Sequence, residues 1–199
     1  MKPTTTYIHK TSIVDNNVTI GASCRIWHFC HISSGSKLGS ECVLGQNVYI
    51  GPNVEIGSGV KLQNNVSVYQ GIVIEDDVFC GPSMVFTNVI NPRAFIERKE
   101  QFKKTIVRKG ATLGANCTIL CGIEIGEYAL VGAGAAVTKS IPAFALVAGV
   151  PARQHGWVSK YGHNLNFQNN AATCPESSDV YELINGKCML KPENKHEVF

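Results

Sequence analysis

The chain has 199 residues, a length that suits one domain with at most a small appendage. Its net charge of +3, without Lys/Arg clusters interleaved with aromatic residues, argues against a nucleic-acid-binding protein. No run approaches the roughly 18 apolar residues that span a bilayer, and the first residues lack the apolar core of a signal peptide. We therefore expect a cytoplasmic protein that makes no use of a membrane.

An unbroken six-residue repeat organises residues 8–86. Every sixth position is apolar: Ile8, Val14, Ile20, Ile26, Ile32, Leu38, Leu44, Ile50, Ile56, Leu62, Val68, Ile74, Cys80 and Phe86. The next residue is often glycine, and the residue four places on is small or β-branched. Fourteen hexads in one register predict an all-β fold, the parallel β-helix, in which each hexad is a short strand plus a corner. Three hexads make one coil, so residues 18 apart should stack at the normal strand spacing of about 4.8 Å.

The eight cysteines follow the same pattern. Five of them occupy inward positions of the repeat: Cys24, Cys30, Cys42 and Cys117 in the small slot, and Cys80 in the large one. They are typical of compact apolar fillers that remain thiols.

A charged insert interrupts the repeat at residues 88–106, where the Asn-Pro step at 91–92 is a turn signal. The repeat then resumes at Val107 and runs to Val137, which gives twenty hexads, or close to seven coils. Because an open end would expose core and strand edges, we expect a cap. Residues 145–153 are the expected closing strand and turn, and residues 156–165 a short capping helix.

The last residues predict a separate small element. After Leu165 the composition shifts to Asn, Gln, Ser and Pro, which favours a linker. Asn185-Gly186, between alternating segments at 180–191, predicts a terminal β-hairpin. Cys174 and Cys188 flank it, but two thiols do not make a structural zinc site, so we expect no metal. The chain thus divides into a β-helix domain over 1–155, with the insert at 88–106, and a C-terminal part over 156–199.

Stacking brings candidate binding residues together in columns. His28, Gln46 and Asn64 are 18 apart, and Asn47 and Asn65 follow them. These amides would suit a polar ligand rich in oxygen atoms, although asparagine also favours corners because it tolerates the left-handed conformation, the explanation we prefer for Asn16, Asn17 and Asn53. A second column holds Tyr69, Gln70, Thr87 and Asn88 and leads into the insert.

His28 and His31 are candidate general bases, because an unperturbed histidine titrates near pH 6.5. For each of them we prefer the alternative explanation, a satisfied surface histidine or one packed at a subunit interface. Arg93 and Arg98 in the insert could hold a carboxylate or phosphate, or could simply be solvated. Corners at Gly114, Gly132 and Ala133 could offer open backbone N–H groups to a close-lying cofactor, and Lys139, Arg153 and Lys160 could meet phosphates.

Several long motifs resemble one enzyme family. The hexads, the insert and the ending AGVPAR (148–153) resemble the left-handed β-helix, or hexapeptide-repeat, acyltransferases over residues 8–162. GQNVYIG (45–51), QNNVSVY (63–69), EDDVFCGPSMVFTNVINPRA (75–94) and GATLGANCTILCG (110–122) are most similar to N-acetyltransferases that act on UDP-2-acetamido-3-amino-2,3-dideoxy-D-glucuronate. Those enzymes make diacetamido uronic acids for bacterial surface polysaccharide such as O-antigen.

The resemblance implies a homotrimer that binds acetyl-CoA and a UDP-amino sugar between subunits. It further implies that Asn88 sits beside the reacting 3-amino group, with no obvious protein base and the CoA sulfur as a proton acceptor. An amide cannot act as a base at neutral pH, so Asn88 would orient the amine, and a catalytic role for His28 would conflict with this mechanism. Gln46, Asn64, Tyr69, Arg93 and Arg98 then become candidate sugar-nucleotide ligands, and Gly114, Gly132, Ala133 and Arg153 candidate acetyl-CoA ligands.

Three alternatives use the same scaffold. A zinc carbonic anhydrase would need three histidine ligands, including a pair spaced five apart, which the histidines here do not supply. A structural or ice-binding solenoid would carry flat rows of threonine rather than amides and a basic insert. An acetyltransferase for another nucleotide-linked amino sugar, a dTDP- or UDP-3- or 4-amino-deoxyhexose, would rest on the same residues and is the strongest competitor.

Overall fold

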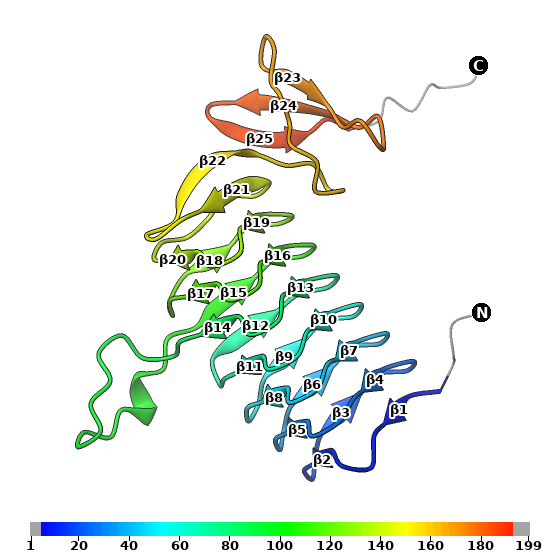
Figure 1. The fold of residues 1–199 in the computed structure, drawn as a ribbon, viewed down its shortest axis with the longest axis vertical. Helices are drawn as coiled ribbons and strands as arrows, with labels where there is room; N and C mark the ends of the chain where they lie inside the picture. Colours follow the sequence, from blue (N-terminus) through cyan, green and yellow to red (C-terminus); the bar gives the residue numbers. More distant parts are fainter. Residues whose placement is uncertain (1–4, 193–199) are drawn as a thin grey trace.

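Stacked coils of very short strands form a three-sided solenoid, with a small antiparallel sheet at its C-terminal end (Figure 1). The computed structural model describes residues 5–192. Each full coil gives one strand to each of three parallel sheets, so the predicted parallel β-helix is confirmed. Among the described residues, the single helical element is the 3₁₀ turn η1 (Lys99–Gln101), and no helix is long and apolar enough to cross a membrane.

The first sheet has eight parallel strands and one antiparallel strand at its C-terminal edge. Its order is β1 (Tyr7–Ile8), β4 (Arg25–Ile26), β7 (Val43–Leu44), β10 (Lys61–Leu62), β13 (Phe79–Cys80), β16 (Thr112–Leu113), β19 (Leu130–Val131), β21 (Ala145–Ala148) and β22 (Arg153–Trp157). The parallel strands place an eighth level on top of the seven coils expected from the hexads.

The other two sides are built in the same way. The second sheet runs β2 (Ile13–Val14), β5 (His31–Ile32), β8 (Tyr49–Ile50), β11 (Ser67–Val68), β14 (Val85–Phe86), β17 (Thr118–Ile119) and β20 (Ala136–Val137). The third contains β3 (Thr19–Ile20), β6 (Lys37–Leu38), β9 (Glu55–Ile56), β12 (Ile72–Ile74), β15 (Thr105–Val107) and β18 (Glu124–Ile125). We call the turns from the first to the second sheet the first corner, those from the second to the third the second corner, and those back to the first the third corner.

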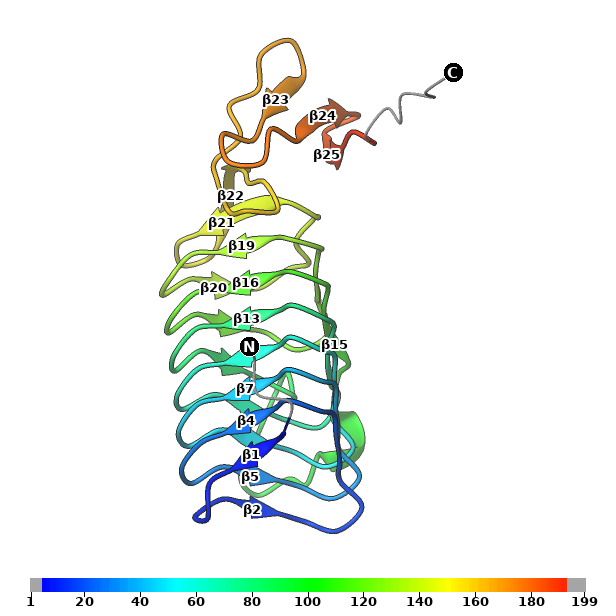
Figure 2. The ribbon, with the colours of Figure 1, turned by 90° about the vertical axis from the view of Figure 1, so that its right-hand side faces the viewer.

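The strand pairing confirms the 18-residue period. Ile26 pairs with Leu44 and Leu44 with Leu62, always 18 positions apart. The second residue of each strand points inward, and those of the middle coils are fully buried. The apolar hexad position therefore builds one continuous core along the solenoid. Figure 2 shows from the side the stacked coils that surround it.

The inward cysteines combine packing with a weak hydrogen bond. Cys24, Cys30 and Cys42 are almost fully buried, and each thiol lies 3.1–3.2 Å from the carbonyl oxygen of a corner glycine in the next coil. Ser36 occupies the equivalent position and donates to Gly51 O at 2.8 Å. Burial raises the pKa of Cys42 to about 12, so this thiol stays protonated. All eight cysteines are free, as expected for packing groups.

The insert leaves the solenoid as an arm at the second corner (Figure 1). Phe86 pairs with Ile119 in the next coil. These residues are 33 positions apart instead of the usual 18, so the insert adds 15 residues to one coil. The predicted end of the insert at residue 106 is wrong, because Thr105–Val107 already forms β15 and pairs with Ile72–Ile74. Backbone pairing across β12 recruits Thr105 and Ile106 before the apolar repeat itself resumes.

The expected capping helix at 156–165 is also wrong. Strand β22 takes up residues 153–157 and pairs antiparallel with β21, and the chain then folds back so that Leu165 N donates to Trp157 O at 2.9 Å. The open edge of β21 needs backbone partners, which a strand supplies and a helix cannot. Gly156 and Gly162 also disfavour a helix over this segment.

The C-terminal hairpin is confirmed and gains a third strand. Strands β24 (Val180–Ile184) and β25 (Lys187–Leu190) flank Asn185 and Gly186, whose φ angles of 51° and 71° suit a two-residue hairpin turn. Strand β23 (Ala171–Thr173) pairs with β24. The sheet has its own small core, in which buried Tyr181 packs edge-on against Phe144 of the solenoid at 5.4 Å.

Candidate functional site

The first corner stacks the predicted amide column as the repeat requires. Trp27, Gly45 and Gln63 follow the paired residues Ile26, Leu44 and Leu62, and His28, Gln46 and Asn64 come one place later. A cleft of about 250 Å³ opens there, lined by Trp27, His28, Val43, Gly45, Gln46, Gln63 and Asn64. The prediction that Gln46 and Asn64 lie on the same side of the prism is therefore confirmed.

Asn64 has a structural task in this corner. Its Oδ1 accepts a hydrogen bond from Gln46 N at 2.9 Å, and Ser58 and Asp76 serve the third corner in the same way. Asn47 and Asn65 adopt φ angles near 61° and 63°, so they fill left-handed corner positions. A ligand-binding role for Gln46 and Asn64 stays a prediction.

His28 lies over His9, with ring centroids 3.6 Å apart, and His9 Nδ1 lies 2.9 Å from Thr11 Oγ1. Partial burial, followed by the nearby His28 and Lys10, lowers the pKa of His9. His31 Nε2 lies 3.2 Å from Asp15 Oδ1 on the outer face of the second sheet. Each histidine thus has a neighbour within the protein, and its role in proton transfer stays a prediction.

Asn88 lies at the second corner, across the second sheet from His28. It opens the arm, and its carbonyl oxygen accepts Lys103 N at 2.9 Å, which closes the neck of the arm. Two threonine hydroxyls fix this neck to the next coil, because Thr87 Oγ1 accepts Cys121 N at 2.9 Å and Thr105 Oγ1 accepts Gly122 N at 3.1 Å. Tyr69 is at the same corner as Asn88, one coil earlier.

The arm carries the two arginines proposed to hold a carboxylate. Arg93 donates to Pro92 O and Arg98 Nη1 to Gln101 Oε1, at 2.8 and 2.9 Å. Arg98 Nε is buried without a hydrogen-bond partner. Two apolar side chains near them point into solvent, since Ile90 is 72% and Phe95 84% exposed. The arm therefore combines an exposed apolar surface with a buried guanidinium N–H that has no partner.

The glycine column does not offer open N–H groups, which corrects that part of the cofactor prediction. Gly114 N donates to Val131 O and Gly132 N to Val147 O, both at 2.8 Å, so the coil ladder uses them. A Cβ atom at Gly114 would lie 2.5 Å from Ala133 N, so close coil packing requires glycine. Gly114 and Gly132 instead offer a cofactor a strip of surface that has no side chains.

A second cleft, of about 310 Å³, lies near the C-terminal end at the second corner. It is lined by Val137, Thr138, Lys139, Ser140, Ile141, Pro142, Val147, Ala152, Arg153 and Gln154. Lys139 and Arg153, two of the basic residues predicted to meet phosphates, come together here. Lys160 does not join them, because its Nζ lies 5.7 Å from the ring centre of Tyr128.

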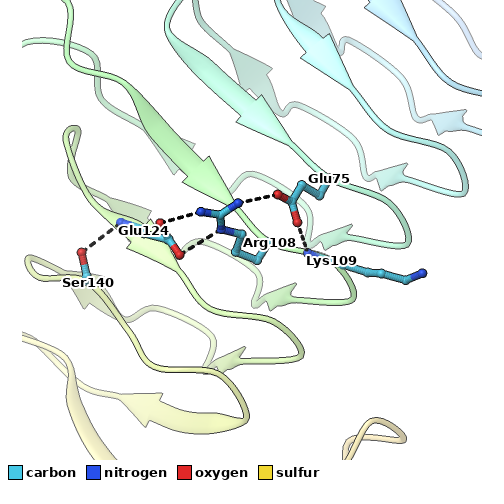
Figure 3. Close-up of polar contacts among 5 residues, drawn as sticks. All are labelled: Glu75, Arg108, Lys109, Glu124 and Ser140. Atoms are coloured by element: carbon cyan, nitrogen blue, oxygen red, sulfur yellow. Dashed lines mark hydrogen bonds and ion pairs between the residues drawn. The ribbon is translucent and has the colours of Figure 1, made fainter.

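An ion-pair network on the third sheet joins the coils on either side of the insert (Figure 3). Arg108 Nη1 contacts Glu75 Oε1 at 2.7 Å, and Arg108 binds both Glu124 oxygens at 2.9 and 3.0 Å. Arg108, through hydrogen bonding and its charge, lowers the pKa of Glu124 against the opposing effect of burial. Sequence reasoning missed this network because the insert places Glu75 and Arg108 33 positions apart.

Comparison with known proteins agrees with the repeat. The family model described as bacterial transferase hexapeptide (six repeats) matches residues 17–52, and the hexapeptide repeat of succinyl-transferase matches residues 35–70 and 105–139. The chain therefore carries the hexapeptide repeat that these bacterial transferase models describe, over residues 17–70 and 105–139. The second model stops at residue 70 and resumes at 105, on either side of the arm.

Two curated acetyltransferases match part of the chain. The dTDP-3-amino-3,6-dideoxy-alpha-D-galactopyranose 3-N-acetyltransferase of Aneurinibacillus thermoaerophilus is 52% identical over 75 residues, which are 38% of this chain and 39% of the relative. A serine acetyltransferase of Buchnera aphidicola is 37% identical over 84 residues, 42% of this chain and 30% of the relative. The chain thus aligns with less than half of the length of either relative.

A solved structure supports the fold. The acetyltransferase domain of PglB from Neisseria gonorrhoeae, in complex with acetyl coenzyme A, superposes with a TM-score of 0.50 at 16% identity. The match covers 76% of this chain and 58% of that domain. At this identity the similarity concerns the architecture of the hexapeptide-repeat family alone.

Metal chemistry has no obvious centre here. Within residues 5–192, no three His, Cys, Asp or Glu side chains come close enough together to hold an ion. The thiol of Cys174 lies 3.2 Å from Ser159 Oγ rather than in a ligand cluster.

Proposed function

We propose that this protein transfers the acetyl group of acetyl-CoA to the 3-amino group of a nucleotide-linked amino sugar. The observation that carries the proposal is the 52% identity, over 75 residues, to a relative named as a 3-N-acetyltransferase of a dTDP-linked 3-amino sugar. The substrate we favour is UDP-2-acetamido-3-amino-2,3-dideoxy-D-glucuronate, because the long motifs at 45–51, 63–69 and 75–94 resemble enzymes for that sugar. The product would serve bacterial surface polysaccharide, and the reaction would take place in the cytoplasm.

Asn88 is the residue we assign to the reacting amine. It stands at the neck of the arm, where the Thr87 and Thr105 hydroxyls hold the backbone against the next coil. An amide side chain placed in this way orients an unprotonated amine toward an electrophile, a contribution that depends on fixed geometry. His28, at the other edge of the second sheet, remains a weaker candidate for the proton acceptor.

The C-terminal cleft fits the phosphates of acetyl-CoA. Lys139 and Arg153 supply positive charge to its wall, and Gly114, Gly132 and Ala133 leave a smooth strip along the first corner. Acetyl-CoA supplies the activated acetyl thioester. The protein's part is to bind it, align the amine and exclude water.

The proposed assembly is a homotrimer, and the separation of the candidate groups supports a site between its subunits. Gln46 belongs to the first corner and Asn88 to the second, so a site between neighbouring prisms would bring one corner of each together. The exposed Phe95 and Ile90 on the arm suit burial against a second copy. In the same arrangement Arg98, whose Nε has no partner, and Arg93 would reach the carboxylate of the uronic acid.

The dTDP-linked 3-amino-6-deoxy sugar is the second candidate substrate, favoured by the name of the same relative. It lacks a carboxylate, so it separates the two possibilities directly. Release of free CoA thiol would be followed with the UDP-uronate, its 6-hydroxy counterpart and dTDP-3-amino-6-deoxyhexoses as acceptors.

Turnover of the uronate that is lost in Arg98→Met, but not in the matched surface variant Lys99→Met, would support the uronate assignment. Turnover of the dTDP sugars alone would move the assignment to the second candidate. If none of these acceptors led to release of the CoA thiol, the acetyltransferase proposal would be refuted.

Mixing two inactive variants tests the shared site. Gln46→Ala and Asn88→Ala trimers, dissociated and reassembled together, should regain activity, because mixed trimers contain some sites with both residues intact. No regain, or a fully active monomer by sedimentation, would contradict a site between subunits.

A further inference from the structure

The first-corner cleft is shaped by a missing side chain. Gly45 lies between Trp27 and Gln63 in the column along the solenoid, and a Cβ atom there would lie 2.5 Å from Asn64 Oδ1. Glycine is therefore obligatory in this coil, and the slot is a fixed feature. With strands about 4.8 Å apart, the backbones at Trp27 and Gln63 lie two levels apart, about 9.6 Å along the axis.

That gap suits a flat ring. A planar group stacked on the indole occupies about 3.5 Å, which leaves room for the flexible Gln63 amide to fold down onto its edge. Trp27 is held ready for such contact: Tyr7 packs edge-on against it at 5.8 Å, and its plane lies within 6° of the His28 ring at 6.4 Å. Its own side chain is nevertheless 39% exposed. A large, held and solvent-facing indole is typical of a stacking platform.

The polar groups around the slot match the edge of a pyrimidine. Gln46 and Gln63 line the cleft, and neither side-chain amide makes a hydrogen bond to another residue in the described range 5–192. Each amide offers a donor and an acceptor, which complement the alternating carbonyl and N–H groups of uracil or thymine. Arg25 and Lys61 pair with Val43 from the strands on either side, so two exposed cations stand beside the slot for a diphosphate.

We propose that the cleft between Trp27 and Gln63 binds the pyrimidine base of a nucleoside diphosphate, with the base stacked on the indole. The choice of a pyrimidine nucleotide rests on the proposed function, whereas the stacking site rests on the slot alone. In this arrangement Trp27 and the amides of Gln46 and Gln63 hold the base, and the sugar extends toward the neighbouring subunit.

Tryptophan fluorescence tests this site without any acetyl transfer. The second tryptophan, Trp157, is packed between the two cores at the far end of the solenoid, so Trp157→Phe leaves Trp27 as the single indole. UDP and dTDP should quench its emission saturably, and inorganic pyrophosphate, which lacks a base, should not. If Trp157→Phe folds poorly, the wild-type protein compared with Trp27→Phe gives the same difference signal.

Variants then measure how much Trp27 and Gln63 each contribute to UDP affinity. Trp27→Ala should weaken UDP binding by about 5–150-fold, which corresponds to the 1–3 kcal/mol measured for one stacked base. It should raise KM for the nucleotide sugar more than it lowers kcat, because the base takes no part in the chemical step. Gln63→Leu should reduce binding less and flatten the preference for UDP over GDP. Phe79→Ala, on strand β13 three coils away from the strand that Trp27 follows, is the control and should bind UDP normally.

Equal UDP affinity in Trp27→Ala and the parent, or equal quenching by pyrophosphate, would overturn the proposal. Acetyl transfer with an unchanged KM in Trp27→Ala would reject this binding site and leave the acetyltransferase function standing. Saturable UDP binding at Trp27 in a protein that acetylates no nucleotide sugar would support the binding site and reject the acetyltransferase function.

Discussion

The threonine at the neck of the arm gives a sharp test of how the solenoid positions Asn88. Thr87 is the residue before Asn88, its N–H donates to Ile119 O at 3.1 Å, and its Oγ1 accepts Cys121 N at 2.9 Å. Cys121 is only 6% exposed, so little water can reach its amide. Thr87→Val keeps the shape and branching of the side chain while it removes this acceptor.

The expected cost follows from the unpaired amide. A buried N–H that loses its only acceptor costs about 1–3 kcal/mol, whereas an ordinary exposed hydrogen bond is worth about 1 kcal/mol. For a chain of this size each kcal/mol lowers Tm by roughly 2–4 °C. Thr87→Ser keeps the hydroxyl and removes one partly exposed methyl group, a loss of at most about 0.8 kcal/mol.

Amide hydrogen exchange at Cys121 reads the local effect directly. In Thr87→Val the exchange should accelerate by about 5–150-fold, the equivalent of 1–3 kcal/mol, while Thr87→Ser stays close to the parent. If Asn88 takes its position from this contact, kcat/KM should fall in the valine variant and survive in the serine variant. Equal exchange at Cys121 in both variants would refute the reasoning, because the hydroxyl would then not be what holds the neck.

Three further predictions concern the site and the solenoid. Asn88→Ala should reduce kcat/KM by about 10²-fold with Tm unchanged, as for other single placed polar groups, and wild-type rates would remove Asn88 from the site. Arg108→Met should destabilise the protein at neutral pH. Because Arg108 lowers the pKa of Glu124 below its ordinary 4.5, this ion pair stabilises fully above pH 4.5 and loses its effect as the pH falls further, so denaturation curves of variant and parent should converge in acid. The buried solenoid thiols of Cys30, Cys42 and Cys117 should react slowly with a disulfide reagent at pH 8 and at once in denaturant, because burial raises their pKa, and rapid reaction of these thiols in the native protein would contradict the packing.

Much of the fold can be predicted from the six-residue spacing of the apolar side chains. Period six fixed which side chains face inward, and with three hexads per coil it also fixed that Gln46 would lie next to Asn64. The prediction is strong because each inward position is supported by equivalent ones above and below. The arm was found for the same reason, as the stretch in which that support fails.

The errors fall where the repeat no longer determines the structure. Residues 153–157 became a strand because β21 presents an unpaired edge, a tertiary demand that local propensity does not reveal. The N–H groups of Gly114 and Gly132 were expected to be open, yet parallel coils use them in the ladder between levels. Pairing of Arg108 with Glu75 depends on how many residues the arm removes from the coil, a number that only the strand register supplies.

The distribution of candidate groups over the prism bears on where chemistry can occur. Residues at the corners stack in columns along the solenoid, and the sheets between corners carry outward side chains from strands that are mostly two residues long. Accordingly, the first-corner cleft holds the indole and the amides, whereas the second corner holds Asn88, Lys139 and the arm. A cleft at a corner of the solenoid becomes deeper when a second solenoid packs beside it. If the proposed trimer forms, the arm of one chain and the first corner of its neighbour would enclose the sugar, and the regularity that makes the coil stable would leave catalysis to the contact between copies.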